Sequence, residues 1–334
     1  MTATQSQLDE SSAAGRKRLP VVPASAFGIV LGIAGLSNAW RAAAGHFALP
    51  ATVGDGIALL ALAVWFVLVC LYGLKWILFA EEARKEIVHP VQCCFIGLIG
   101  VATMLCAAMV APFSGALALA FYWIGLLWTL VFAIWRTGAL WQGGHDPTTT
   151  TPVLYLPTVA GCYVAAIVGA ALGYSDLAQL AFGAGFFSWL AMESVILNRL
   201  LNAAELAEPL RPTIGIQLAP PAVGAAAYLS VTNGAPDLLA HAMVGYAMLQ
   251  LLLALRLLPW VMKQPFAASY WAFSFGLTAL ATDLIRMVAR GEQGILSTLA
   301  MPLLWLVTAA IALLAAGTIV LLFRGKLFPL ARAL

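Results

Sequence analysis

The chain is divided into ten apolar stretches, each long enough to cross a lipid bilayer. A helix of about 20 apolar residues spans the hydrocarbon core of a membrane. Charged residues are only 9% of the 334 residues, whereas a soluble domain carries about 25%, so this chain could not cover a water-facing surface. We therefore predict an all-α integral membrane protein with spans at 23–43, 56–78, 91–111, 115–139, 152–173, 176–198, 212–231, 236–258, 266–289 and 297–322.

The basic residues indicate the direction of these spans. Lys and Arg accumulate on the cytoplasmic side of membrane proteins. If the N-terminus is inside, all of the 17 Lys and Arg except Arg41, Arg286 and Arg290 fall on that side. We therefore expect both termini in the cytoplasm, with a polar tail at 1–22, a ten-helix transmembrane domain at 23–322 and a short C-terminal tail at 323–334.

Glycine and proline recur inside the odd-numbered spans. They interrupt these spans near positions 32, 98, 159, 221 and 276, at a period of about 60 residues, which is the length of one helical hairpin. In any single span, small residues also allow helices to pack closely. Five breaks at similar depth favour a shared water-filled cavity, in which the freed backbone groups find hydrogen-bond partners. We predict five tandem hairpins in a pseudo-five-fold arrangement, with the odd-numbered helices around the cavity and the even-numbered helices outside.

Several other classes of function have little support in the sequence. The five cysteines lie inside apolar runs and lack metal-site spacing, so they are expected to pack as small apolar residues. The chain carries no phosphate-binding loop and no HExxH or GxSxG signature, so ATP-driven pumping and an intramembrane enzyme are both disfavoured. We expect no cofactor, no metal and no nucleic-acid partner.

Four segments, taken together, resemble one known family. They are "HPVQCCFIGLIGVATML" (89–105), "HDPTTTTPVLYLPTVA" (145–160), "GIQLAPPAV" (215–223) and "WAFSFGLTALA" (271–281). The chain is similar to the bacterial TehA branch of the tellurite-resistance/dicarboxylate transporter family, which also contains the plant slow-type guard-cell anion channels. The likeness runs in the right order from about residue 23 to the last span.

The resemblance implies a protein of the bacterial inner membrane that passes inorganic or small organic anions across the lipid bilayer. It also implies a homotrimer with one pore in each subunit, and a phenylalanine of the ninth helix that plugs this pore. The matching residue is Phe275, followed by Gly276. The family implies alternatives as well: a proton-coupled carrier of C4-dicarboxylates such as malate, or an exporter of toxic oxyanions. Tellurite is a matter of family naming, since no residue here is known to recognise it.

Helix geometry is compatible with Phe275 as the plug. Successive residues of an α-helix turn by about 100°, so the rings of Phe273 and Phe275 point about 200° apart and only one can face the axis. With Phe275 inward, Thr278 and Thr282 lie roughly on the same face. Arg286 returns to that face about 16 Å further along, as a cation at the outer mouth. A phenylalanine in a narrow pore blocks passage and keeps it dry.

The centre of each odd-numbered span lacks Lys and Arg, and this shapes the expected selectivity. Hydroxyl groups, the N–H groups of broken helices and positive mouths would replace a fixed cation. Such a weak lining favours small monovalent anions and fast flux, and therefore a channel over a tight carrier. The expected lining residues are Gly28, Gly32, Gly35, Gly97, Gly100, Thr103, Met104, Pro157, Thr158, Gly161, Pro220, Gly224, Thr278 and Thr282.

Two carboxylates lie inside spans, where an ionisable residue is a functional candidate by default. Asp283 precedes Arg286 by three residues, a spacing that favours a local ion pair over a part in permeation or proton coupling. Glu193 lies in the sixth, outer span. We expect it to bond polar groups across helices, with Asn198 or Arg136 as partners, and regard proton coupling as the alternative.

Overall fold

The computed structural model describes residues 18–144 and 146–332, and within them ten helical segments are long and apolar enough to cross a membrane. Each overlaps one predicted span, so the prediction of an all-α ten-span protein is confirmed. The spans are Ala24–Phe47 (η1 and α2), Ala51–Leu78 (α3), Gln92–Val110 (η2 and α5), Gly115–Trp141 (α6), Pro152–Ala171 (η4, η5 and α7), Ser175–Asn202 (α8), Glu208–Val231 (η6 and α9), Leu238–Val261 (α10), Ala268–Ala289 (η7 and α11) and Ile295–Phe323 (α12).

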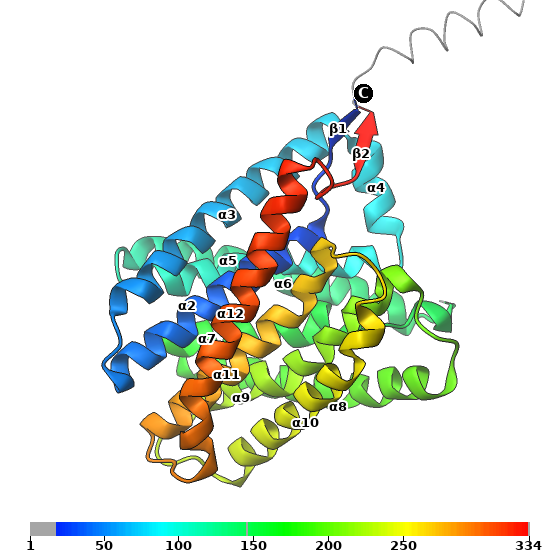
Figure 1. Cartoon of the computed structure of the whole chain (residues 1–334). Helices are drawn as coiled ribbons and strands as arrows, with labels where there is room; N and C mark the ends of the chain where they lie inside the picture. The colour runs from blue at the N-terminus through cyan, green and yellow to red at the C-terminus, as the bar shows by residue number, and fades with distance from the viewer. Residues whose placement is uncertain (1–17, 145, 333–334) are drawn as a thin grey trace, which may run out of the picture.

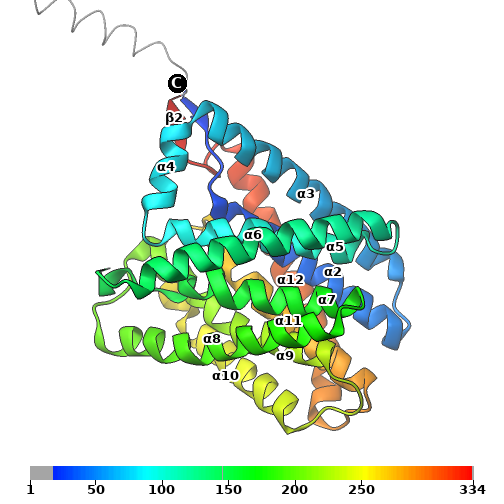
Figure 2. The ribbon, with the colours of Figure 1, turned by 180° about the vertical axis from the view of Figure 1, so that it is seen from behind.

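The spans form an inner and an outer layer. In the most apolar window of each odd-numbered span, 61% to 78% of the residues are buried, against 11% to 33% in the even-numbered spans. The long helices α3, α6, α8, α10 and α12 therefore surround the shorter helices α2, α5, α7, α9 and α11 (Figures 1 and 2). A helix that is apolar on its outer face and exposed in the isolated chain is suited to lipid.

The five inner helices close into a ring. Helix α2 packs against α5, α5 against α7, α7 against α9, and α9 against α11; the contact of α11 with α2 completes the circle. Each inner helix also packs against the outer helix that follows it in sequence, so that every hairpin contributes one inner and one outer member. This is the arrangement that a hairpin repeat predicts.

Each inner span begins with an irregular segment before it becomes a regular α-helix. Four of these segments are 3₁₀-helices: η1 (Ala24–Ala26), η2 (Gln92–Ile96), η6 (Glu208–Leu218) and η7 (Ala268–Phe273). In the fifth span a 3₁₀ turn, η4 (Pro152–Leu154), is followed by a π-helical segment, η5 (Leu156–Ala160). Proline suits such junctions, because a first-turn N–H has no helical partner to lose; Pro157 lies in η5 and Pro220 in the first turn of α9.

The described ends of the chain meet on one side of the molecule. Strand β1 (Arg18–Pro20) pairs antiparallel with β2 (Leu330–Arg332). Helix α4 (Ala80–Val88) lies close to these strands, between the ends of α3 and α5 (Figures 1 and 2). We call this side the near face and the opposite side the far face. The predicted division into tails and a transmembrane domain stays a prediction, since residues 1–17 and 333–334 lie outside the described residues.

Candidate functional site

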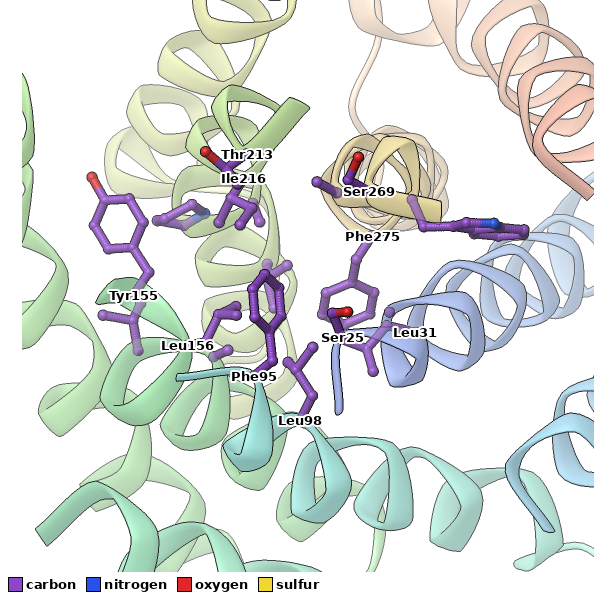
Figure 3. A pocket seen from close by; sticks show the side chains of 18 of the residues that line it. Ser25, Leu31, Phe95, Leu98, Tyr155, Leu156, Thr213, Ile216, Ser269 and Phe275 are labelled. Atoms are coloured by element: carbon purple, nitrogen blue, oxygen red, sulfur yellow. The ribbon is translucent and has the colours of Figure 1, made fainter. Parts of the chain in front are cut away.

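A cavity lies among the first parts of the five inner spans. The volume of this cavity is about 120 Å³, and residues from every inner span line it. In Figure 3 the side chains of Ser25, Phe95, Leu98 and Phe275, from the first, third and ninth spans, lie around this common space. The wall includes Ser25, Gly28 and Leu31 of the first span, Gln92, Phe95 and Leu98 of the third, Tyr155, Leu156 and Tyr163 of the fifth, Thr213, Ile216 and Pro220 of the seventh, and Ser269, Trp271 and Phe275 of the ninth.

The cavity opens toward the near face. A wider hollow with a volume of about 730 Å³ lies there, and Ser25 and Gln92 line both the cavity and this hollow. The wider hollow is bordered by α4, by Pro329 and by Leu330, the first residue of β2. It also contains a buried ion pair, in which Lys75 donates to Glu86 at 2.7 Å. Anything that reaches the cavity from this side passes α4 and the paired terminal strands.

The wall of the cavity is weakly polar and carries no charged residue among those described. Two of its hydroxyl groups are already bonded elsewhere: Thr213 donates to the carbonyl of Leu210, and Tyr155 donates to Glu193. Ser25, Gln92 and Ser269 lie in the 3₁₀ segments that begin their spans. The first N–H groups of a helix have no helical partner and carry a partial positive charge of about half a proton. Some of these first N–H groups are already bonded: that of Ala24 donates to Glu86, and that of Gln92 donates to Nδ1 of His89.

Phe275 lies at the deep end of the cavity. The residue is the second of α11 (Ser274–Ala289), directly after η7, and its ring points from α11 toward Leu31 and Ser25 of the first span (Figure 3). A Cβ atom added to Gly35 of α2 would lie 3.3 Å from Cδ2 of this ring. Phe273 points elsewhere: a Cβ on Gly215 would lie 2.5 Å from its Cγ. The structure therefore places Phe275, and not Phe273, on the cavity wall.

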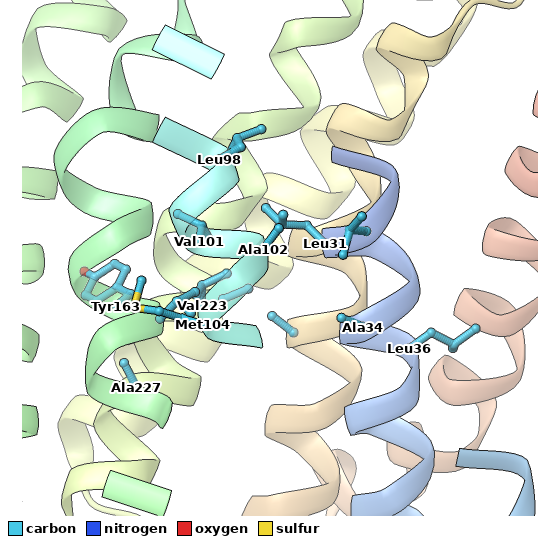
Figure 4. Close-up of a cluster of buried hydrophobic side chains, with 14 of the residues drawn as sticks. Leu31, Ala34, Leu36, Leu98, Val101, Ala102, Met104, Tyr163, Val223 and Ala227 are labelled. Atoms are coloured by element: carbon cyan, nitrogen blue, oxygen red, sulfur yellow. The ribbon is translucent and has the colours of Figure 1, made fainter. Parts of the chain in front are cut away.

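Beyond Phe275 the inner helices meet through buried apolar side chains. The cavity wall ends at Leu31, Leu98 and Val223 on α2, α5 and α9. The next turns toward the far face carry side chains that fill the space between these helices (Figure 4). These buried side chains belong to Ala34, Val101, Ala102, Met104 and Ala227.

Most glycines predicted to line a pore lie instead at contacts between helices. A Cβ on Gly32 would lie 2.4 Å from Ser274 Oγ, and one on Gly35 would lie 2.1 Å from Thr278 Oγ1. Both glycines therefore let α2 approach α11 closely, which is the packing role that the sequence left open. Only Gly28 of the predicted glycines lies on the cavity wall, together with Pro220. The others face side chains or backbone of neighbouring helices: Gly97, Gly100, Gly161, Gly224 and Gly276.

The threonine hydroxyls are bonded mainly to their own helices. Thr278 donates to the carbonyl of Phe275 at 3.0 Å, and Thr282 donates to the carbonyl of Thr278 at 2.9 Å. Thr103 donates to Ile99 and accepts from the indole of Trp65 on α3. Thr158 faces the sulfur of Met192 on α8. In this state of the molecule these hydroxyls support the helix bundle.

Glu193 bonds across helices, but with other partners than expected. Its carboxylate accepts hydrogen bonds from Tyr155 of the fifth span, from Trp189 at 2.8 Å and from Tyr246 of α10 at 2.6 Å. The expected partners Asn198 and Arg136 are wrong, because they bond Asn202 and the carbonyl of Pro90 instead. Tyr155, which was not among the residues expected from the sequence, joins this carboxylate to the cavity wall.

Asp283 and Arg286 do not form the expected ion pair as a direct contact, although their charges still interact. The guanidinium of Arg286 donates to Ser230 Oγ on α9 at 3.0 Å. Both carboxylate oxygens of Asp283 are buried, and neither has a hydrogen-bond partner among the described residues. The neighbouring helix offers Arg286 a hydroxyl at the same depth, so the i, i+3 spacing within α11 does not decide its partner. A buried, unpartnered carboxylate is costly as an anion.

These features define a class: a ten-span membrane protein whose five hairpins surround an uncharged central cavity. Residues 21–319 match the model of the voltage-dependent anion channel family, and the chain belongs to this family. It is 40% identical to the tellurite resistance protein TehA homolog of Haemophilus influenzae, over 78% of this chain and 80% of that protein. It is 25% identical to the S-type anion channel SLAH3 of Arabidopsis thaliana, over 79% of this chain and 42% of that protein. The guard cell S-type anion channel SLAC1 of the same plant is also 25% identical, over 92% of this chain and 57% of that protein.

Proposed function

We propose that this chain is a passive channel for small monovalent anions and that the central cavity is part of its path. The observation that carries the proposal is the cavity itself, which takes wall residues from all five inner spans, Phe275 among them. The relatives named as S-type anion channels support it. Channels conduct when binding is strong enough to admit an ion and weak enough to release it. A wall that carries no charged side chain among the described residues would release an anion readily, which is the second of these conditions.

Phe275 is the gate in this proposal. Its ring lies against Gly35 of α2, and Thr278, which bonds the carbonyl of Phe275, packs on the same glycine. Opening requires the ring to leave the space between α11 and α2, or the two helices to separate. Gly276 lies tightly against the backbone of Leu218 and Ala219, so the alternative of a sliding α11 would first have to break that contact.

The near face is cytoplasmic in this proposal, and the protein lies in the bacterial inner membrane as a homotrimer with one path per subunit. The excess of Lys and Arg expected on the side of both termini supports the orientation, and the pairing of β1 with β2 holds the described ends on one side. The trimer is inferred from the family resemblance. Cross-linking in native membranes tests the oligomer, and protease access to the terminal strands in sealed vesicles tests the orientation.

A second candidate function is a proton-coupled carrier of small dicarboxylates, and the buried carboxylate of Asp283 favours it. The residue lies in an inner helix, is fully buried and lacks a partner among the described residues, as a proton-binding carboxylate would be. Exchange of a proton at this group would change its charge inside the bundle. Its depth beyond Phe275 and the absence of a charged wall residue among those described favour the channel.

Planar-bilayer recordings of the purified protein separate the two functions. A channel gives discrete current steps with chloride or nitrate, and its reversal potential follows the anion gradient alone. A coupled carrier gives no unitary steps, and a pH gradient drives malate uptake into vesicles. Proton-driven malate uptake without anion current steps would contradict the channel proposal.

A further inference from the structure

A long apolar groove lies on the outer surface, between α3, α4 and α6. The volume of this groove is about 550 Å³. Two polar groups of its wall are bonded to the protein: Tyr72 donates to Glu86, and Trp128 donates to the carbonyl of Ile96. The surface that remains is aliphatic and aromatic carbon. The groove is lined by Tyr72 and Trp76 of α3, Ile87 of α4, Ile96 of η2, and Ile124, Leu127, Trp128, Val131, Phe132 and Trp135 of α6.

The length of the groove matches one leaflet of a bilayer. Its wall on α6 runs from Ile124 to Trp135, and eleven residues of α-helix rise about 16 Å. The hydrocarbon core of a bilayer is about 30 Å thick, so one leaflet contributes about 15 Å. Trp76 and Trp135 lie where α3 and α6 approach the near face, the depth at which tryptophan is enriched at a membrane interface. The groove therefore extends from the membrane interface to about the middle of the membrane.

Helix α4 closes the near end of the groove and has the character of an interfacial helix. Figure 2 shows it bridging the space between the ends of α3 and α6. It buries Ala83 and Glu86 against the protein, contributes Ile87 to the groove wall and leaves Val88 81% exposed. An exposed apolar side chain beside charged ones suits a helix that lies in the plane of the headgroups.

Two guanidinium groups near this end lack an anionic partner. Arg84 lies one helical turn before Ile87 and Val88, is exposed, and makes no ion pair with any described residue. Arg136 follows Trp135 on α6 and donates to the carbonyl of Pro90, just after α4, while its buried Nε has no partner among the described residues. By contrast Lys85 is paired with Glu82 at 2.7 Å. Arg84 and Arg136 are not part of the groove wall, but along the chain they lie close to two residues that line its near end, Ile87 and Trp135.

We propose that this groove binds an anionic phospholipid, with one acyl chain along α6 and the phosphate held by Arg84 and Arg136. The apolar slot fits a hydrocarbon chain of one leaflet, and the two cations fit a negative headgroup at the interface. Arginine suits this position because its planar fork bonds phosphate oxygens in pairs. The proposal concerns lipid recognition on the outer surface and does not depend on what passes through the central cavity.

Native mass spectrometry of the delipidated protein tests this proposal. Titration with phosphatidylglycerol is expected to give tighter binding than titration with phosphatidylcholine of the same chain length. Arg84→Gln is expected to weaken phosphatidylglycerol binding about fivefold, the effect of one interfacial cation, and to leave phosphatidylcholine unchanged. Arg324→Gln is the matched control, because this exposed arginine follows the end of α12 on the same face and belongs to neither α4 nor α6, the helices that carry Arg84 and Arg136; it should bind like the wild type.

A second variant tests the groove itself. Leu127 lines the groove and is 65% exposed, so Leu127→Trp fills the slot without entering the core and should weaken binding of both lipids. Inorganic phosphate should not displace the bound lipid, since it lacks the chain. Equal binding of the two lipids in the wild type, or phosphatidylglycerol binding unchanged by both variants, would overturn the proposal. A change in subunit number caused by Leu127→Trp, with lipid binding unchanged, would assign the groove to a second copy of this chain.

Discussion

At the scale of single residues, Glu193 shows how one carboxylate joins the two layers of the bundle. It lies on the outer helix α8 and accepts hydrogen bonds from three aromatic side chains, one of which, Tyr155, lines the central cavity. A charged acceptor with three donors is strongly satisfied, since hydrogen bonds to an ionised group exceed neutral ones in strength. Loss of this acceptor would free Tyr155 and loosen the cavity wall.

Glu193→Gln is expected to destabilise the protein by about 1–3 kcal/mol, because an amide NH₂ would face donors that now point at a carboxylate oxygen. The thermal unfolding midpoint in detergent measures this change. The control is Asp176→Asn at the start of the same helix, whose exposed side chain makes no hydrogen bond with any described residue. Equal midpoints for Glu193→Gln and the wild type would show that the cluster does not hold the helices together.

At the scale of elements, the contact of α2 with α11 places the phenylalanine. Gly32 and Gly35 provide the room on α2, and Ser274, Thr278 and Phe275 occupy it from α11. Small residues that let two helix backbones approach are a principal means of association inside a membrane. The glycines of the first span therefore act on Phe275 through packing.

Gly35→Ala is expected to destabilise the protein by about 1–3 kcal/mol, the usual effect of overpacking, because its Cβ would lie 2.1 Å from Thr278 Oγ1. Gly45→Ala on the same helix is the control. Nothing lies within 4 Å of a Cβ at that position, so the substitution should be neutral or slightly stabilising, as alanine is favoured over glycine in a helix. Chemical or thermal unfolding of both variants in detergent measures the difference, and equal effects would refute the close contact.

The buried ion pair of Glu86 with Lys75 fixes α4 to α3 and to the start of the first span. Glu86 accepts from Lys75, from Tyr72 and from the backbone N–H of Ala24. Glu86→Gln is expected to destabilise the protein by about 3 kcal/mol, because it leaves Lys75 buried without its counter-ion. The exposed pair of Lys85 with Glu82 is the internal comparison, since Glu82→Gln should change stability by at most about 1 kcal/mol. Similar unfolding midpoints for the two variants would contradict this account.

At the scale of the whole molecule, the sequence was sufficient for the ten spans and for the inner and outer layers. Long apolar runs fix the spans, and Gly and Pro in alternate spans indicate which helices are interior. Hydropathy could not reveal α4, which is short and charged, or the pairing of β1 with β2, which joins residues more than 300 positions apart. It also could not assign partners to buried polar groups. Arg286 bonds Ser230, 56 residues away, because the neighbouring helix, and not the local spacing, determines what lies beside it.

The choice of Phe275 over Phe273 rested on the family resemblance, because helical periodicity alone could not decide between the two residues. Helical angles show that the two rings point apart, but not which one faces the axis. The structure places Phe275 on the cavity wall and Phe273 over Gly215. This distinction makes the two phenylalanines a matched pair within one helical turn of each other.

The most direct test of the account is the single-channel conductance of Phe275→Ala beside Phe273→Ala and the wild type, in planar bilayers with chloride or nitrate. Removal of the Phe275 ring should open the space between α11 and α2 and raise anion conductance by at least about tenfold, since the proposal makes this apolar ring the barrier. Phe273→Ala removes an equal ring away from the cavity and should conduct like the wild type. Wild-type conductance from a folded Phe275→Ala protein would contradict the gate.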